Sequence, residues 1–148
     1  MYNVFSVAKI LCKAGGWQLS NLQLQKILYI LQVLHLGINS KPLFQAKFEA
    51  WNYGPVVPEV YHRFKLFGNK PVQEWAFPRI DENIPQTDLS FIAEASSALS
   101  KLPPFKLVAL THRKGTAWEQ NYEPGIWDIC IPESDMRQEF FDVWEKKN

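Results

Sequence analysis

The sequence lacks the residue patterns on which most enzymes depend. It contains no Gly-x-Ser-x-Gly turn, no phosphate-binding glycine loop and no Cys-x-x-Cys pair, and its only adjacent glycines are Gly15 and Gly16. The histidines lie too far from one another and from the cysteines to form a metal-binding motif. We therefore expect a protein that is not an enzyme, with no catalytic residue, no metal site and no cofactor.

Cysteine, net charge and long apolar stretches are also scarce. Cys12 and Cys130 lie far apart in apolar surroundings, which favours two buried thiols over a disulfide. The 16 basic and 15 acidic residues leave a formal charge of +1, too small a field to bind a phosphate backbone, so we do not expect a nucleic-acid partner. The uncharged residues 27–40 are fewer than the about 20 that a membrane span requires, and the N-terminus has no signal-peptide pattern. These absences favour a cytoplasmic protein with no membrane partner.

The chain does contain enough apolar material for one self-sufficient core. Of its 148 residues, 47% are hydrophobic and 14% are aromatic. A domain of this size buries roughly two thirds of its unfolded surface without disulfides or metals. Because no repeat or compositional break divides the sequence, we expect one domain over residues 1–148 and no separate DNA-binding domain.

Capping residues and apolar periodicity predict a mainly α fold. Asn3 and Ser20 can each cap a helix N-terminus, and each is followed by apolar residues at helical spacing. The second of these helices, over residues 20–36, is expected to end at Gly37. Because helix 20–36 is apolar on nearly all sides, we expect it in the middle of a compact multi-helix domain.

The rest of the chain is expected to add shorter elements around this central helix. Extended pieces at residues 47–53 and 72–77 are expected to form a short two-stranded β element, and residues 78–87 an exposed loop. Asp88 and Pro132 are each expected to start a helix. The other expected helices cover residues 57–67, residues 103–112 and a short stretch after Thr116.

Residues 51–58, Trp-Asn-Tyr-Gly-Pro-Val-Val-Pro, form the most informative segment of the sequence. Two prolines and a glycine in this short run prevent a helix from continuing into it, so we expect a shaped turn that leads into the next helix. Pro55 and Pro58 have no amide proton, so the turn offers more carbonyl acceptors than donors. It therefore needs donors from elsewhere in the fold.

Polar side chains on the central helix can provide those donors. Gln25, Tyr29 and Gln32 recur at helical spacing along one side of helix 20–36, and Lys26 lies at the margin of this stripe. We favour this structural role over direct contact with a partner. The two roles are compatible if the turn itself is the interface.

Three segments of the sequence together resemble the Panacea antitoxin domain family, the SocA-like and phage-associated GepA group. Residues 22–29 (LQLQKILY) resemble its LKLQKLLYY helix. Residues 41–44 and 48–61 resemble its KPLF…FEAWKYGPVVPELY signature, with Asn52 where a lysine is common. Residues 110–118 resemble its LTHxxGxxW block, so the resemblance covers most of the chain up to that block.

The resemblance implies an antitoxin that neutralises a cognate protein toxin by direct binding, without a cofactor, in a setting that includes phage defence. One alternative is a proteolytic adaptor that delivers the toxin to an ATP-dependent protease, with the charged residues 145–148 as the candidate tether. A second alternative is a DNA-binding regulator, because the first two helices are joined by Gly15 and Gly16. Homo-oligomerisation is left open.

The resemblance and the donor argument together identify a set of scaffold residues. Trp51 and Trp118 adjoin turns that need packing support, so we expect them in the core. His112 lies at the end of a helix, where a cation complements the helix dipole. The expected scaffold residues are Gln25, Lys26, Tyr29, Gln32, Trp51, Tyr53, Gly54, Pro55, Val56, Pro58, Tyr61, Thr111, His112 and Trp118.

Partner contacts are expected beside this scaffold, on residues 59–78 and the nearby loops. Trp17, Trp75 and Trp127 lie in loops or short extended pieces, where a large aromatic side chain is hard to bury. The candidate partner-binding residues are Trp17, Tyr53, Glu59, His62, Arg63, Lys65, Phe67, Trp75 and Trp127.

Overall fold

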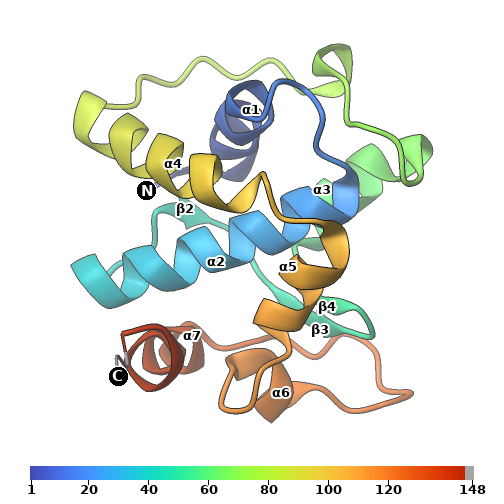
Figure 1. The fold of residues 1–148 in the computed structure, drawn as a ribbon, viewed down its shortest axis with the longest axis vertical. Helices are drawn as coiled ribbons and strands as arrows, with labels where there is room; N and C mark the ends of the chain where they lie inside the picture. Colours follow the sequence, from blue (N-terminus) through green and yellow to red (C-terminus); the bar gives the residue numbers. More distant parts are fainter. Residues whose placement is uncertain (146–148) are drawn as a thin grey trace.

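The computed structural model describes residues 1–145 and shows a mainly α fold around one central helix (Figure 1). Helix α2 (Asn21–Asn39) crosses the middle of the molecule, with α1 (Val4–Ala14) and α4 (Gln86–Leu99) on one side and α7 (Glu133–Glu139) on the other. The prediction of a mainly α domain around a central buried helix is confirmed. The other helical segments are α3 (Pro58–Phe64), α5 (Pro104–Thr111), α6 (Ala117–Asn121), the 3-10 turns η1 (Lys65–Phe67) and η2 (Glu74–Ala76), and the π-helical turn η3 (Phe140–Trp144).

The first two helices begin where the capping residues predicted. The Asn3 side chain accepts a hydrogen bond from the Phe5 amide at 2.8 Å. Ser20 and Gln23 form a reciprocal capping box, in which each side chain accepts a hydrogen bond from the other residue's amide. These contacts satisfy amides that a helix N-terminus leaves without intrahelical partners.

The predicted end of the central helix at Gly37 is wrong. Helix α2 continues to Asn39 and ends at Ser40, which adopts the left-handed conformation (φ 62°) and donates its amide to the Leu36 carbonyl. Gly37 instead packs directly against Phe140, because a Cβ atom at position 37 would lie 2.0 Å from Cγ of that ring. Glycine at this position therefore permits close packing of two segments and does not terminate the helix.

The structure contains two small sheets. Strand β1 (Tyr2–Asn3) pairs in parallel with β2 (Phe44–Gln45). Strand β3 (Glu49–Trp51) pairs antiparallel with β4 (Gly54–Val56) and forms the β3–β4 hairpin. On the other side of β3, residues 129–131 add backbone hydrogen bonds from the Ala50 amide to the Ile129 carbonyl and from the Ile131 amide to the Phe48 carbonyl.

The expected β element is thus half right. Its first piece, residues 47–53, contains β3, but the partner is the adjacent β4 and not residues 72–77. Residues 72–77 contain the 3-10 turn η2, and the Val72 amide donates to the Leu19 carbonyl at 2.8 Å. Val72, Ala76 and Phe77 are buried, so this apolar segment packs into the core without forming a strand.

Two further expectations are corrected by long-range packing. Helix α4 starts at Gln86 after Pro85, so Asp88 is not its cap; the Asp88 carboxylate accepts a hydrogen bond from the Tyr2 hydroxyl. Cys12 is buried as expected, but Cys130 is exposed. Neighbouring residues of an extended chain point to opposite faces, so Cys130 faces solvent while Ile131 enters the core.

A buried carboxylate connects the central helix to the C-terminal part of the fold. The Glu139 carboxylate accepts hydrogen bonds from the Tyr29 hydroxyl, the Ala117 amide and the Trp144 indole. Burial raises the pKa of Glu139, and the three hydrogen bonds partly oppose this shift. This contact could not be predicted from the sequence, because its donors come from three separate segments.

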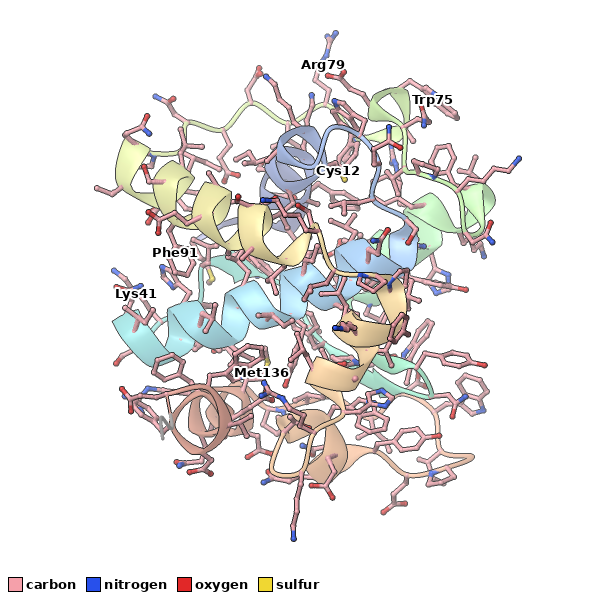
Figure 2. All side chains as sticks on the ribbon, viewed as in Figure 1. Cys12, Lys41, Trp75, Arg79, Phe91 and Met136 are labelled. Atoms are coloured by element: carbon pink, nitrogen blue, oxygen red, sulfur yellow. The ribbon has the colours of Figure 1, made fainter. Side chains whose placement is uncertain are left out.

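The distribution of side chains agrees with a single apolar core. Figure 2 shows Cys12 and Met136 inside the fold, whereas Trp75 and Arg79 point away from it. Within residues 1–145, none of the helices combines the length and the apolar character that crossing a bilayer requires.

Gly37→Ala tests the packing explanation for this glycine. The added Cβ must displace the Phe140 ring, so we expect the free energy of unfolding to fall by about 1–3 kcal/mol even though alanine favours a helix. Urea denaturation provides the measurement, with Asn39→Ala as a control at an exposed position of the same helix. A stabilised Gly37→Ala variant would contradict the packing explanation.

Candidate functional site

The β3–β4 hairpin is held against the central helix by buried side chains. The Lys26 ammonium donates to the Pro55 carbonyl at 3.0 Å, as the shortage of donors in this turn predicted. Gln25 has the opposite role to the expected one, because its side-chain oxygen accepts from the Val57 amide at 2.8 Å. The Gln25 amide then donates to Asn21 one turn earlier. The helix therefore supplies both a donor and an acceptor to this end of the hairpin.

Contrary to the expectation, the hydrogen bonds of Tyr29 and Gln32 within residues 1–145 go to segments other than the turn. Tyr29 donates to Glu139, as described above. Gln32 binds the segment before the hairpin: its amide donates to the Phe44 carbonyl, and its oxygen accepts from the Leu43 and Phe44 amides. The polar stripe on α2 thus holds three different segments in place.

A column of stacked rings supports the other side of the hairpin. The Trp118 indole donates to the Trp51 carbonyl at 2.7 Å. The His112 ring stacks on Trp118 with centroids 3.7 Å apart, and Tyr122 stacks on Trp118 at 4.7 Å. The Tyr122 hydroxyl closes the arrangement by donating to the Asn52 side chain at 2.8 Å.

Close packing explains the glycine at the turn. Gly54 has φ of 116°, a conformation that side chains disfavour. A Cβ atom here would lie 2.9 Å from Cε of Lys26 and 3.1 Å from Oγ1 of Thr111. Thr111 itself donates to the Val108 carbonyl one turn back. The end of α5 and the central helix therefore meet directly beneath the hairpin.

The pKa values of two side chains beneath the hairpin, Lys26 and His112, are lowered. Burial lowers the pKa of Lys26 to about 7. The pKa of His112 is also lowered, first by burial and then by the nearby Lys26 charge. His112 Nε2 is buried without a hydrogen-bond partner among the described residues, a hydrogen bond with the Tyr53 backbone partly opposes the fall in the pKa of His112, and the ring stacks on Trp118.

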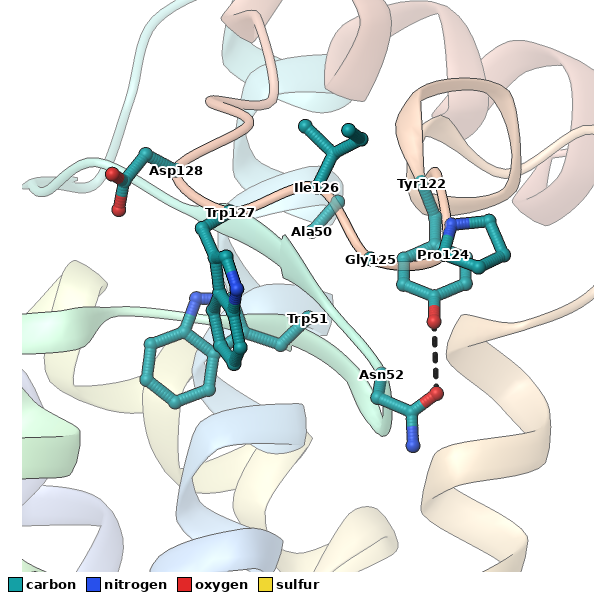
Figure 3. Close-up of a pocket in the computed structure, with 9 residues that line it drawn as sticks. All are labelled: Ala50, Trp51, Asn52, Tyr122, Pro124, Gly125, Ile126, Trp127 and Asp128. Atoms are coloured by element: carbon teal, nitrogen blue, oxygen red, sulfur yellow. Dashed lines mark hydrogen bonds between the residues drawn. The ribbon is translucent and has the colours of Figure 1, made fainter.

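Two hollows lie beside the hairpin on the protein surface. We call the larger one, with a volume of 520 Å³, the hairpin groove. The smaller one, of 320 Å³, is the adjoining hollow, and Figure 3 shows its lining, with Asp128 at one end and the hydrogen-bonded Tyr122 and Asn52 at the other. Trp51, Asn52 and Trp127 line both hollows.

Two aromatic side chains at this face are strongly exposed. Tyr53, at the tip of the hairpin, is 69% exposed, and Trp127 is 80% exposed. Lys65 of the predicted partner-binding set and Tyr61 of the predicted scaffold also line the hairpin groove, and the exposed His62 ring lies 6.3 Å from the Trp51 ring. The sequence did not predict Leu22, Asn52 or Asp128 here, because their contribution depends on how distant segments meet.

The remaining predicted partner residues lie elsewhere. Glu59 lies in a separate depression near the N-terminus. Arg63 donates to the Ala76 carbonyl, and Phe67 contacts the exposed Trp75 edge to face at 5.5 Å. The expectation of an exposed Trp17 is wrong, because this ring is half-buried against Phe77.

Two other expectations concern metals and the tail. Among residues 1–145, no group of three or more His, Cys, Asp or Glu side chains is arranged to hold a metal ion. The predicted protease tether comprises residues 145–148, of which residues 146–148 lie outside the described part of the chain.

Lys26→Met tests the electrostatic cost of the buried lysine. Folding lowers the pKa of Lys26 from 10.5 to about 7, so between these pH values the unfolded chain holds more protons and stability rises with pH. We expect the free energy of unfolding of the unmodified protein, relative to Lys26→Met, to rise by about 4 kcal/mol from pH 7 to pH 10. Denaturant titrations across this range measure the difference.

The control for this experiment is Lys13→Met, which removes an exposed lysine. Subtracting the free energy of unfolding of each variant from that of the unmodified protein removes the contributions that the two proteins share, such as the titration of Cys12. A Lys26 difference that does not change with pH would show that Lys26 is not desolvated.

Comparisons with known proteins identify the family of this chain. The family model described as "Antitoxin SocA-like, Panacea domain" matches residues 24–119. Antitoxin SocA of Caulobacter vibrioides (strain NA1000 / CB15N) is 31% identical in an alignment 114 residues long, and the alignment covers 68% of this chain and 58% of that relative. The chain therefore spans less than two thirds of the length of that relative. No solved structure matches the chain significantly.

The matched region contains Lys26, the whole β3–β4 hairpin and Trp118, which are the parts that build the site. It covers well over half of the 148 residues. This chain belongs to the SocA-like Panacea antitoxin family.

Proposed function

We propose that this chain is an antitoxin that neutralises a protein toxin by direct binding, and that the β3–β4 hairpin and Trp127 form the contact surface. The proposal depends on one observation: Tyr53 extends into solvent from a hairpin whose base is fixed on both sides, and Trp127, from the segment after α6, is exposed beside it. Exposed aromatic side chains beside a hollow are the usual anchors of a protein interface.

The rigidity of the hairpin favours a binding role. Lys26 and Gln25 hold one side of the hairpin, and Trp118 holds the other. A surface that is already ordered loses little conformational entropy on association, so more of the contact energy contributes to affinity. A partner can therefore bind the tip without first organising it.

The proposal assigns no catalytic step to the chain. The polar groups of Gln25 and Lys26 are engaged in holding the hairpin, and the His112 ring is covered by Trp118. The reported name of the relative, an antitoxin, is consistent with a protein that acts by binding.

The two alternatives make different demands on the molecule. A proteolytic adaptor would use the same face for the toxin and would need a second contact with an ATP-dependent protease. A DNA-binding regulator would need an exposed reading helix, whereas α2 is buried along most of its length. The DNA-binding alternative therefore has the weaker support.

Co-expression with the product of the adjacent gene tests the proposal. We expect the unmodified chain to restore growth and to co-purify with that product. Replacing both Tyr53 and Trp127 by alanine removes two anchors, each of which typically contributes about 2 kcal/mol or more, so affinity should fall by roughly 100-fold or more. Isothermal titration calorimetry measures the affinity, and circular dichroism checks the fold.

Trp75→Ala is the matched control, because this tryptophan is 72% exposed on η2, outside both hollows. It should bind as the unmodified chain does. Full binding by the double variant would refute the proposed surface, and failure of the unmodified chain to bind or to restore growth would refute the antitoxin proposal. A shortened toxin half-life with no block of toxin activity in vitro would identify the adaptor instead.

A further inference from the structure

We propose that the hairpin groove binds an acidic, apolar segment of the partner protein, with an apolar side chain in the groove and an adjacent Asp or Glu carboxylate against Lys65. This inference rests on the proposed function, since it specifies which part of a toxin the hairpin face accepts.

The groove is suited to an apolar side chain. Its volume of 520 Å³ lies within the range, about 300–1,000 Å³, of sites that enclose small ligands, so an aromatic side chain has room to enter. Leu22 and Val56 contribute apolar surface, and the rings of Trp51, Tyr61 and Trp127 surround it.

The side-chain amides at the base of the groove, those of Asn21 and Gln25, already form hydrogen bonds within the protein. The Asn21 amide donates to the Tyr61 carbonyl, and its oxygen accepts from Gln25. The Gln25 oxygen in turn accepts from the Val57 amide. An apolar side chain that covers these groups therefore leaves none of them without a partner, and the desolvation cost is small.

The charges along the groove favour a carboxylate beside the bound apolar side chain. The residues that line it include Lys26 and Lys65 and no carboxylate. The Lys26 side chain is fully buried and donates to the Pro55 carbonyl, so it acts on the contents of the groove only through its charge, whereas Lys65 is exposed. A carboxylate at the groove interacts favourably with both lysines, whereas a cation is repelled by them.

The neighbouring hollow gives the bound segment a direction. Asp128 lines the adjoining hollow and not the hairpin groove. A carboxylate is therefore favoured at the Lys65 side of Trp127 and disfavoured at the Asp128 side. A segment with its acidic residue at one end can bind in one orientation only.

Carboxylate binding is linked to proton uptake by Lys26. The ionisable groups around it are Tyr53 on the hairpin, His112 at the end of α5, Lys65 across the groove and, one turn along α2, Tyr29 with its partner Glu139. Burial places the pKa of Lys26 at about 7, and a nearby carboxylate raises it. The complex therefore holds more protons than the free protein above pH 7, so affinity for an acidic segment falls as pH rises.

A matched pair of peptides tests the charge preference without requiring the toxin. The probes are acetyl-Asp-Leu-Phe-Asn-amide and acetyl-Asn-Leu-Phe-Asn-amide, titrated into ¹⁵N-labelled protein at low salt and pH 7, with the Trp127 indole resonance as the readout. We expect the acidic peptide to bind at least fivefold more tightly. That advantage should shrink in Lys65→Gln and persist in Lys70→Gln, which removes an exposed lysine outside the groove.

The pH dependence adds a readout that a general surface attraction would not produce. Between pH 7 and pH 9, the Kd of the acidic peptide should rise several-fold, whereas that of the amide peptide should stay constant or fall. Equal affinities, a preference for acetyl-Lys-Leu-Phe-Lys-amide, or self-association of the protein through Trp127 would overturn the inference.

The inference and the proposed function fail separately. If the toxin requires Tyr53 and Trp127 but the two peptides bind equally, the acidic-segment inference is wrong and the antitoxin proposal stands. If the peptides differ as expected but the adjacent gene product does not bind, the groove chemistry stands and the antitoxin proposal is wrong.

Discussion

The hydrogen bond from Lys26 to the Pro55 carbonyl is the contact on which the functional face depends. Proline makes the hairpin rich in acceptors, so a donor must reach it from another element. A fully buried lysine on the central helix provides that donor at the cost of desolvating a charge. An apolar side chain of similar length could fill the space but would leave the carbonyl unpaired. The hairpin and the central helix are thus matched by polarity as well as by shape.

The same principle extends around the central helix. Gln25, Gln32 and Tyr29 each bind a different segment of the chain. A helix that is buried on all sides can use polar side chains only if each finds a defined partner. These side chains therefore set the positions of the hairpin, of β2 and of the C-terminal helical segment relative to one helix. Apolar contacts alone would tolerate small shifts between them.

Local chemistry was readable from the sequence, whereas contacts between distant segments were not. The caps at Asn3 and Ser20 act on amides two or three residues away, so their sequence patterns were sufficient. Gly37 was predicted to end the helix, because its contact with Phe140 joins distant parts of the chain and is not visible in the local sequence. The need of the hairpin for a donor followed from proline chemistry, and Lys26 met it. The separate partners of Tyr29 and Gln32 depended on the tertiary fold.

Residues 129–131, which lie along β3 as a third extended segment, affect how the chain behaves in solution. The family match ends at residue 119, but residues 129–131 occupy the outer side of β3. Without them, the backbone amide of Ala50 and the carbonyl of Phe48 would face solvent as an open strand edge. Open edges recruit strands from other molecules and promote aggregation. Residues 129–131, beyond the family match, thus protect this edge of β3 from uncontrolled assembly and leave the aromatic tip free.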